Sequence, residues 1–271
     1  MQSESFTHTT LGSTGIPVCR MGLSATYRPG KKAVYYAFDH GINYFFGFGI
    51  DTQMTRAMRD IVKTNRDSVI IATGVYNLIW GYPDIRKTLE KRLRQWGTDY
   101  IDLFMFLGVR KKKEFPQIAR EELIQLREEG KVRAIGMSTH DRKFAGELAE
   151  KGTLDAMMIR YNAAHRGAEE DIFPYTYSHN PGIISFTATR WRYLIRRPKG
   201  WSSDAPVPTA SDCYRFVLSN PHVHVCMTAP SNMKQLKDNL KALDLGSLSS
   251  EEMDFMKNFG DVVHNQRKWF M

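Results

Sequence analysis

The sequence predicts a single domain, residues 1–271, with the fold of an eight-stranded α/β barrel, the TIM or (β/α)8 type. Eight short apolar runs alternate with longer amphipathic runs, an order that indicates parallel strands joined by right-handed helical crossovers. The length of 271 residues is typical of one such barrel. A doubly wound open sheet, the alternative, would normally have a glycine-rich phosphate turn after its first strand, where this chain has Ser24–Tyr27.

The strand candidates are short runs rich in apolar and β-branched residues, which favour buried parallel strands. In chain order they are Val18–Leu23, Asn43–Phe46, Val69–Thr73, Ile101–Phe106, Ala134–Met137, Ala156–Ile159, Ile183–Thr187 and Val223–Thr228. Amphipathic runs follow the strands and predict helices. These are Lys32–Asp39, Thr52–Lys63, Ile85–Trp96, Ile118–Glu129, Arg142–Lys151, Glu169–Ser178, Ser211–Asn220 and Met233–Leu243.

Chemical signals mark several helix boundaries. Asp84 follows Pro83 and puts a carboxylate at the N-terminus of the third helix, where the helix dipole favours negative charge. Asp141 is the predicted N-cap of the fifth helix. Gly130 follows an acidic run and predicts the C-terminal end of the fourth helix.

Two further elements lie outside the eight repeated units. Thr9–Val18 contains two glycines between short β-like runs, which predicts a β-hairpin that plugs the floor of the barrel. Ser250–Arg267 predicts an extra C-terminal helix that starts near Ser249, with two glutamates in its first turn. No linker or low-complexity segment divides the chain, so one domain is the economical interpretation.

The composition is that of a basic protein without membrane or secretion signals. There are 38 Lys and Arg residues against 29 Asp and Glu, a net charge of +9, which is typical of a protein with an anionic ligand or substrate. The alternative is a basic but otherwise ordinary soluble enzyme. No zinc-knuckle, RRM or helix-turn-helix motif supports nucleic acid as a partner. The polar N-terminus lacks a signal peptide, no run reaches about 18 apolar residues, and three scattered cysteines fit a reducing compartment. We therefore expect a cytoplasmic protein with no membrane contact.

Short motifs occur in a fixed order along residues 9–243. They are Leu11–Gly15 with Met21–Leu23, then Gly41–Phe45, Gly97–Leu103, Gly130–Ser138, Arg160–Asn162 and Ser231–Leu240. In this order the motifs resemble the aldo-keto reductase superfamily, and GTDYIDL at Gly97–Leu103 is close to a signature of it. The resemblance implies a TIM barrel with its active site at the carboxyl ends of the strands.

The resemblance also implies where a catalytic tetrad of Asp, Tyr, Lys and His would lie. This chain differs from the family at all four positions, with Phe46, Asp51, Gly74 and Leu107. In the family the Tyr hydroxyl gives a proton to the developing alkoxide, and the Lys, paired with the Asp, lowers the pKa of that hydroxyl. Three of the replacements have no titratable proton, and an ionised Asp51 would repel an oxyanion. The chain therefore resembles a divergent member whose usual reaction has changed or been abandoned.

An NADP(H) site is implied by the resemblance and is retained in part. The positions that match the nicotinamide site are Ser138, Thr139, Met158 and Phe186, and those that match the adenosine site are Lys234, Gln235, Asp238 and Asn239. Met158 cannot bond a carboxamide. Gln235 replaces the family arginine that clamps the 2′-phosphate, and this change removes a bidentate charged contact.

A basic segment follows the seventh predicted strand. It runs from Arg190 to Lys199 and interleaves Arg192 and other cations with Trp191. Barrel loops after strands seven and eight often hold phosphate, so Arg190 is a candidate cofactor ligand. The alternative is a solvated charged loop with its aromatic residues packed underneath.

Other polar residues at predicted strand ends could supply a replacement acid or base. The candidates are Tyr27, Asp51, Tyr76 and His140, and His140 is the most plausible base near neutral pH. The alternative for each is a loop contact or a helix cap. No metal site is predicted, because His222, His224 and Cys226 alternate along one strand about 7 Å apart at each step.

Three functions remain open at this point. The leading one is a divergent NADP(H)-linked oxidoreductase with a non-tetrad active site, acting on a small carbonyl or anionic metabolite. The second is a non-redox enzyme, a lyase, isomerase or cyclase, on the same scaffold. The third is a non-catalytic pseudoenzyme that binds a nucleotide or a partner protein.

Overall fold

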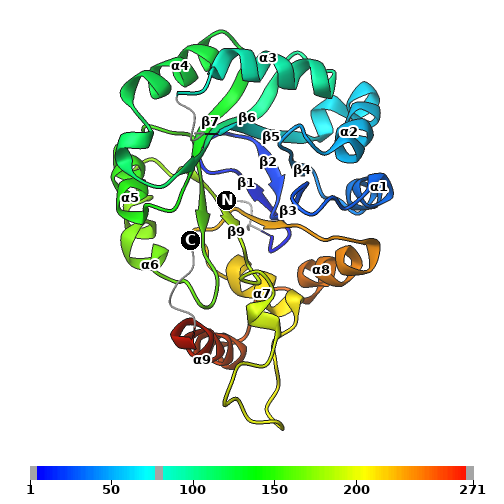
Figure 1. The fold of residues 1–271 in the computed structure, drawn as a ribbon, viewed down its shortest axis with the longest axis vertical. Coiled ribbons are helices and arrows are strands. Elements are labelled where there is room, and N and C mark those ends of the chain that lie inside the picture. The colour runs from blue at the N-terminus through cyan, green and yellow to red at the C-terminus, as the bar shows by residue number, and fades with distance from the viewer. Residues whose placement is uncertain (1–4, 77–81, 267–271) are drawn as a thin grey trace.

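The computed structural model describes residues 5–76 and 82–266 and shows a closed barrel of parallel strands inside a ring of helices (Figure 1). The barrel strands are β3 (Met21–Ser24), β4 (Tyr44–Phe46), β5 (Ile70–Tyr76), β6 (Ile101–Val109), β7 (Val132–Thr139), β8 (Ala156–Arg160), β9 (Gly182–Phe186) and β10 (Val225–Thr228). Pairing of Cys226 with Met21 joins β10 to β3 and closes the barrel. The predicted fold class is therefore confirmed.

The helices cover the outside of the barrel in chain order (Figure 1). They are α1 (Lys31–Asp39), α2 (Thr52–Asn65), α3 (Ile85–Trp96), α4 (Gln117–Glu128), α5 (Arg142–Glu150), α6 (Ala168–Asp171), α7 (Ala210–Leu218), α8 (Met233–Leu245) and α9 (Ser250–Gln266). Asp84 and Asp141 are N-caps, as predicted, because their carboxylates accept hydrogen bonds from Lys87 N and Phe144 N. Among the described residues, none of the helices is long and apolar enough to cross a membrane.

Two predicted elements differ from those observed. The sixth helix was expected over Glu169–Ser178, but α6 has only four residues and a 3-10 turn follows at Phe173–Tyr175. Pro174 accounts for this, since proline lacks an N–H and disfavours a continuous helix. The predicted strand Val18–Leu23 is divided, because its first part belongs to the hairpin and its second part to the barrel.

The N-terminal hairpin closes the floor of the barrel, as predicted. Its strands β1 (His8–Thr10) and β2 (Pro17–Cys19) are antiparallel. Leu11, Ile16 and Val18 are buried in the same apolar cluster as the inward side chains of the barrel strands. This core excludes water from the lower half of the barrel and leaves the opposite end for ligands.

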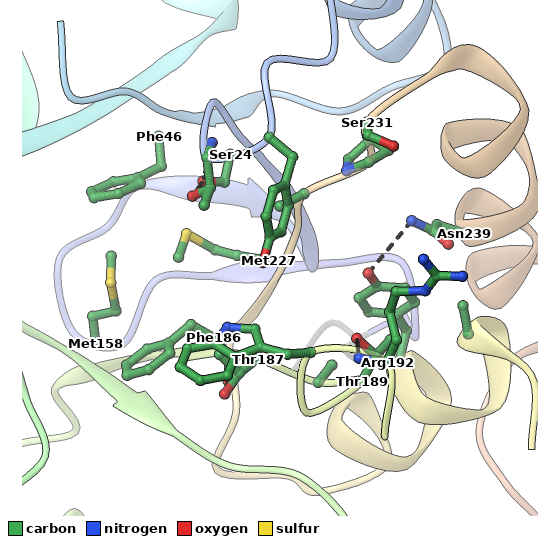
Figure 2. Close-up of a pocket in the computed structure, with 18 of the residues that line it drawn as sticks. Ser24, Phe46, Met158, Phe186, Thr187, Thr189, Arg192, Met227, Ser231 and Asn239 are labelled. Carbon is green, nitrogen blue, oxygen red and sulfur yellow. Dashed lines mark hydrogen bonds between the residues drawn. The ribbon is translucent and has the colours of Figure 1, made fainter. Parts of the chain in front are cut away.

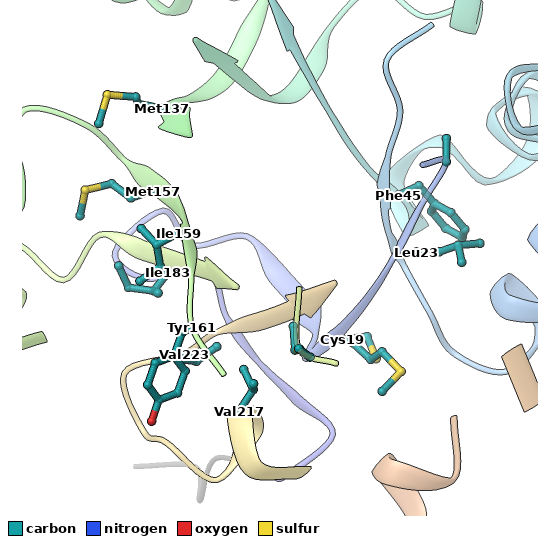
Figure 3. Close-up of a cluster of buried hydrophobic side chains, with 14 of the residues drawn as sticks. Cys19, Leu23, Phe45, Met137, Met157, Ile159, Tyr161, Ile183, Val217 and Val223 are labelled. Atoms are coloured by element: carbon teal, nitrogen blue, oxygen red, sulfur yellow. The ribbon is translucent and has the colours of Figure 1, made fainter. Parts of the chain in front are cut away.

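A second apolar layer lies between the barrel and its helices. Figure 3 shows part of it, where Ile159 and Ile183 lie beside each other and Val217 of α7 lies by Tyr161 and Val223. Side chains alternate along each strand, so each strand supplies one row to the barrel interior and one row to this layer.

A fully buried carboxylate connects three neighbouring segments at the amino ends of the strands. Asp102 at the start of β6 lies 2.9 Å from Arg66 and 3.0 Å from Arg133, and it accepts a hydrogen bond from Ile71 N. Asp102 itself is 0% exposed. The Arg133 side chain is 45% exposed, whereas that of Arg66 is 15% exposed, so loss of the carboxylate would leave Arg66 and the Ile71 N–H without their partner away from water.

We expect Asp102→Asn to lower the free energy of unfolding by about 3 kcal/mol, because it removes the charge that pairs both arginines. Urea denaturation followed by circular dichroism measures this loss. Asp99→Asn, at an exposed neighbouring position, is the control and should change stability by less than about 0.5 kcal/mol. Equal stabilities of the two variants would contradict the role given to Asp102.

Candidate functional site at the carboxyl ends of the strands

A cavity of about 610 Å³ opens at the carboxyl ends of the barrel strands. Figure 2 shows it extending from Phe46 and Met158 at one end to Ser231 and Asn239 at the other. The volume lies within the range of small-molecule and cofactor sites, roughly 300–1,000 Å³. None of the described residues that line the cavity is acidic.

The inner end of the cavity is aromatic and apolar. Phe46 ends β4 and is buried, and the Phe48 ring meets it edge-on with centroids 4.8 Å apart. The Tyr76 ring lies 5.6 Å from Phe48, and Leu107 of β6 completes this wall. We call these four residues the inner corner. It contains two of the positions that were aligned with the family tetrad.

Gly74, a third tetrad position, lies where β5 and β6 approach closely. A Cβ atom built on Gly74 would be 2.1 Å from the carbonyl oxygen of Met105 and 2.9 Å from Cγ of Leu107. No heavy-atom contact of that length is sterically allowed, so the backbone would have to move for any side chain. A lysine therefore does not fit here in the present backbone geometry.

Asp51, the fourth position, caps a helix and is not among the residues that line the cavity. Its Oδ1 accepts hydrogen bonds of 2.9 Å from Gln53 N and Met54 N at the start of α2, and the residue is 6% exposed. This placement does not support contact with a ligand and fits the alternative of a helix cap, because Oδ1 accepts from the N-terminus of the helix. The signal was visible in the sequence, since an Asp directly before a helical run is a typical N-cap.

The other three acid-base candidates all line the cavity: Tyr27, Tyr76 and His140. Burial raises the pKa of Tyr76 to about 12, although nearby Arg92 opposes the shift. Partial burial, with Arg160 and Arg110 nearby, lowers the pKa of His140 below its usual value. At neutral pH the tyrosine is therefore protonated and the imidazole is uncharged.

The predicted nicotinamide residues lie between the two ends of the cavity. Ser138, Met158 and Phe186 line it, and His140 meets the Phe186 ring edge-on at 5.5 Å. The Ser138 hydroxyl accepts a hydrogen bond from Gly108 N, which leaves its own proton for a ligand. Thr139 is buried and accepts from Asp141 N, so it is not part of the lining.

The far end of the cavity is polar. Asn239 donates to Thr228 at 2.8 Å, and Thr228 donates to the Tyr214 hydroxyl at 3.0 Å. Gln235 also lines this end, and its side-chain oxygen accepts from the backbone N–H and hydroxyl of Ser231. Tyr214 was not predicted, because nothing in the sequence of α7 indicates which of its buried side chains reaches the cavity.

Two predicted adenosine-site residues lie outside the described lining. Asp238 forms an ion pair of 2.8 Å with Lys241 on the exposed side of α8. Lys234 is exposed on the same helix. Helix periodicity explains this, since residues 235 and 239 share one face while their neighbours turn away.

Arg190 and Arg192 of the basic segment are placed differently by the structure. Arg190 is 0% exposed and donates to the carbonyl oxygen of Val263 in α9 at 2.6 Å, so its placement does not support contact with a cofactor. Arg192, two residues later, lines the cavity (Figure 2). Residues 190, 191 and 192 have φ angles of 48°, 51° and 73°, a run of left-handed conformations that sequence patterns do not predict.

Comparison with known proteins agrees with the architecture. The model of the aldo/keto reductase family matches residues 25–190. The uncharacterized oxidoreductases YqkF and YrpG of Bacillus subtilis are 21% and 25% identical, over 92% and 90% of this chain and 94% and 93% of their own. The holo form of aldo-keto reductase AKR11C1 from Bacillus halodurans has a TM-score of 0.77 at 20% identity, over 93% of this chain and 95% of that one. An aldo/keto reductase from Klebsiella pneumoniae in complex with NADP and acetate has a TM-score of 0.72 at 21% identity, with the same coverage.

We expect Gly74→Ala to destabilise the protein by about 1–3 kcal/mol, the usual range for overpacking a filled core. Thermal or urea denaturation measures the change. The double variant Gly74→Ala/Leu107→Ala is the control, because it removes the side-chain contact and keeps the contact with the Met105 carbonyl. If Leu107→Ala restored the stability of Gly74→Ala, the backbone would not be the obstacle.

Proposed function

Since the chain belongs to the aldo/keto reductase family, we propose that it is a divergent NADP(H)-linked oxidoreductase with a non-tetrad active site. The observation that supports this most directly is the single cavity that joins the inner corner, Phe186 and Asn239. A dinucleotide needs such an elongated site, with a place for a flat ring at one end and polar groups at the other.

The residues present fit the cofactor in several respects. Phe186 offers an aromatic face, and Ser138 offers a hydroxyl donor beside it. At the far end the Asn239, Thr228 and Tyr214 network is satisfied internally, which fixes the wall that would contact the adenosine half. The lack of acidic residues in the described lining suits a phosphorylated ligand.

Reduced nicotinamide, when bound, supplies a hydride for reduction of an acceptor. The protein must then position the acceptor and provide a proton. The inner corner would hold an apolar part of the acceptor against Phe46, Phe48 and Leu107. We propose a small carbonyl metabolite as acceptor, because a carbonyl needs a proton as the oxyanion develops.

Tyr76 is the proton-bearing residue that we assign to this step. It is paired with Leu107 across β5 and β6, and it stands two residues after Gly74, on the same face of its strand. Its ring contacts Phe48 in the inner corner. His140 also lines the cavity, but it lies beside Phe186 rather than beside the inner corner.

The raised pKa of Tyr76 limits the rate that we expect. A general acid works best when its pKa is near the operating pH. Tyr76, with a pKa of about 12, stays protonated at neutral pH, but it is a weak acid and transfers its proton slowly. We therefore expect slow turnover on simple aldehydes.

A non-catalytic nucleotide-binding protein is the second candidate. The apolar character of Phe46 and Leu107, together with Gly74, favours it, because the described inner corner has Tyr76 as its one titratable group. The two candidates differ in turnover and agree in cofactor binding. For either, we propose the cytoplasm as location, which the three free, buried cysteines suit.

The first test is NADPH titration followed by nicotinamide fluorescence. We expect binding in the micromolar range by the wild type and by Tyr76→Phe, because phenylalanine keeps the ring that lines the cavity. Turnover on a panel of aldehydes, ketones and quinones should fall by about 100-fold in Tyr76→Phe, within the usual range for a general acid. Tyr177→Phe, on an exposed tyrosine (79%) far from the lining, is the matched control.

Failure of the wild type to bind NADPH at millimolar concentration would refute the proposed function. Binding without turnover on the whole panel would favour the non-catalytic candidate. Full activity of Tyr76→Phe would be compatible with the proposed oxidoreductase function, but it would exclude Tyr76 as the general acid.

The pH dependence separates Tyr76 from His140. The donating form of Tyr76 is the neutral phenol, which is present below its pKa of about 12 and is lost as the pH rises through that value. The donating form of His140 would be the imidazolium, which its lowered pKa confines to acidic solution. We therefore expect kcat to stay level from about pH 6 to 10. A kcat that is highest in acidic solution and falls as the pH rises, with the fall below the ordinary histidine range, would instead indicate His140.

A further inference from the structure

The far end of the cavity has one full positive charge. Among the described residues that line the cavity, Arg192 is the one that carries a formal charge at neutral pH. Figure 2 draws Arg192 toward Asn239 and Ser231, away from Phe46 and Met158. This cation comes from the loop after β9, whereas Gln235 and Asn239 come from α8.

Helix α8 offers no cation of its own to this end of the cavity. Gln235 is neutral, and its oxygen is engaged by Ser231 at 2.8 Å and 2.9 Å. Lys241 pairs with Asp238, and Lys237 lies 5.0 Å from the centre of the Tyr36 ring. Lys234, the third lysine of α8, is exposed and is not among the residues that line the cavity. Within the described lining, a phosphate at this end would therefore depend on the loop after β9 for its counter-charge.

The backbone of the loop after β9 fixes where Arg192 points. Arg190 is anchored in the core by its bond to Val263, and Tyr193 N donates to the Arg190 carbonyl. Arg192 itself has φ of 73°, a conformation that is costly for an arginine and persists when its surroundings enforce it. Such strain is concentrated at functional sites, and here it presents one guanidinium to the cavity.

The Arg192 guanidinium is also available to a ligand. Its backbone N–H bonds weakly to Thr189 at 3.4 Å, but within the described parts of the chain its side chain has no hydrogen bond or ion pair. The residue is exposed. An arginine at a cavity wall that has no acceptor within the protein can use the N–H groups of its guanidinium to bind an oxyanion.

We propose that Arg192 binds the phosphate on the adenosine ribose of the cofactor and makes the protein selective for NADP(H) over NAD(H). This inference rests on the proposed function. The two cofactors differ by that one phosphate, which carries nearly two negative charges near neutral pH. A guanidinium can meet it with two parallel hydrogen bonds. Selectivity then comes from the β9 loop, because the α8 position offers neutral Gln235.

The test measures binding of NADPH and NADH by isothermal titration calorimetry, without turnover. Wild type should bind NADPH at least 10-fold more tightly than NADH. Arg192→Gln should weaken NADPH binding by about 10- to 100-fold, the effect of losing a charged hydrogen-bonded contact, and should change NADH binding less than twofold. Arg196→Ala, at an exposed arginine outside the lining, is the control and should bind both cofactors like wild type.

A second variant tests whether a folding defect, rather than the lost charge, explains weaker binding. Arg192→Asn removes the charge with a residue that tolerates the left-handed backbone at this position, and it should reproduce the loss measured for Arg192→Gln. Raising the salt concentration should weaken NADPH binding by wild type more steeply than by either variant. Circular dichroism of each variant establishes that the fold is kept.

The outcomes separate the two proposals. If wild type binds neither cofactor, the proposed function fails and this inference fails with it. If wild type binds NADPH and the Arg192 variants bind it equally well, the inference alone is refuted. Equal weakening of NADPH and NADH would also refute it, because Arg192 would then contact a part that both cofactors share.

Discussion

The pairing of β10 with β3 is the constraint on which the rest of the structure depends. It closes the sheet, so that the carboxyl ends of all the barrel strands lie on one rim and the hairpin fills the other end. Residues as distant in the chain as Phe46, Ser138 and Asn239 then line a single cavity. In an open sheet the same side chains would be spread along one edge, and no site of this length would form.

Closure also determines what the inner corner can contain. Parallel strands β5 and β6 pack so closely at Gly74 that a side chain there would meet the Met105 carbonyl. The neighbouring positions, Phe46 and Leu107, fill the space with apolar groups. Polar atoms in such a corner lose hydration, which is why Tyr76 at its edge has a raised pKa. The corner therefore suits an apolar part of a ligand.

Charge is arranged unevenly along the cavity. The inner corner is uncharged, whereas the far end faces Arg192 and has no acidic residue in the described lining. A net charge of +9 adds a favourable long-range field for anions. An elongated ligand with a neutral ring and a phosphorylated end would be oriented by this difference in charge between the two ends of the cavity. The strained loop after β9 maintains the difference, because it holds Arg192 at the cavity wall.

The sequence by itself determined the barrel, its hairpin, most helix boundaries and the family, because hydrophobic periodicity, caps and ordered motifs are local signals. It also indicated Tyr27, Tyr76, His140, Ser138, Met158, Phe186, Gln235 and Asn239, which the structure places on one cavity. Only the tertiary structure decided that Arg190 is buried while Arg192 faces the cavity, and that Gly74 has no room for a side chain. These facts depend on side-chain direction and on contacts between distant segments, which exist only after the chain has closed into the barrel.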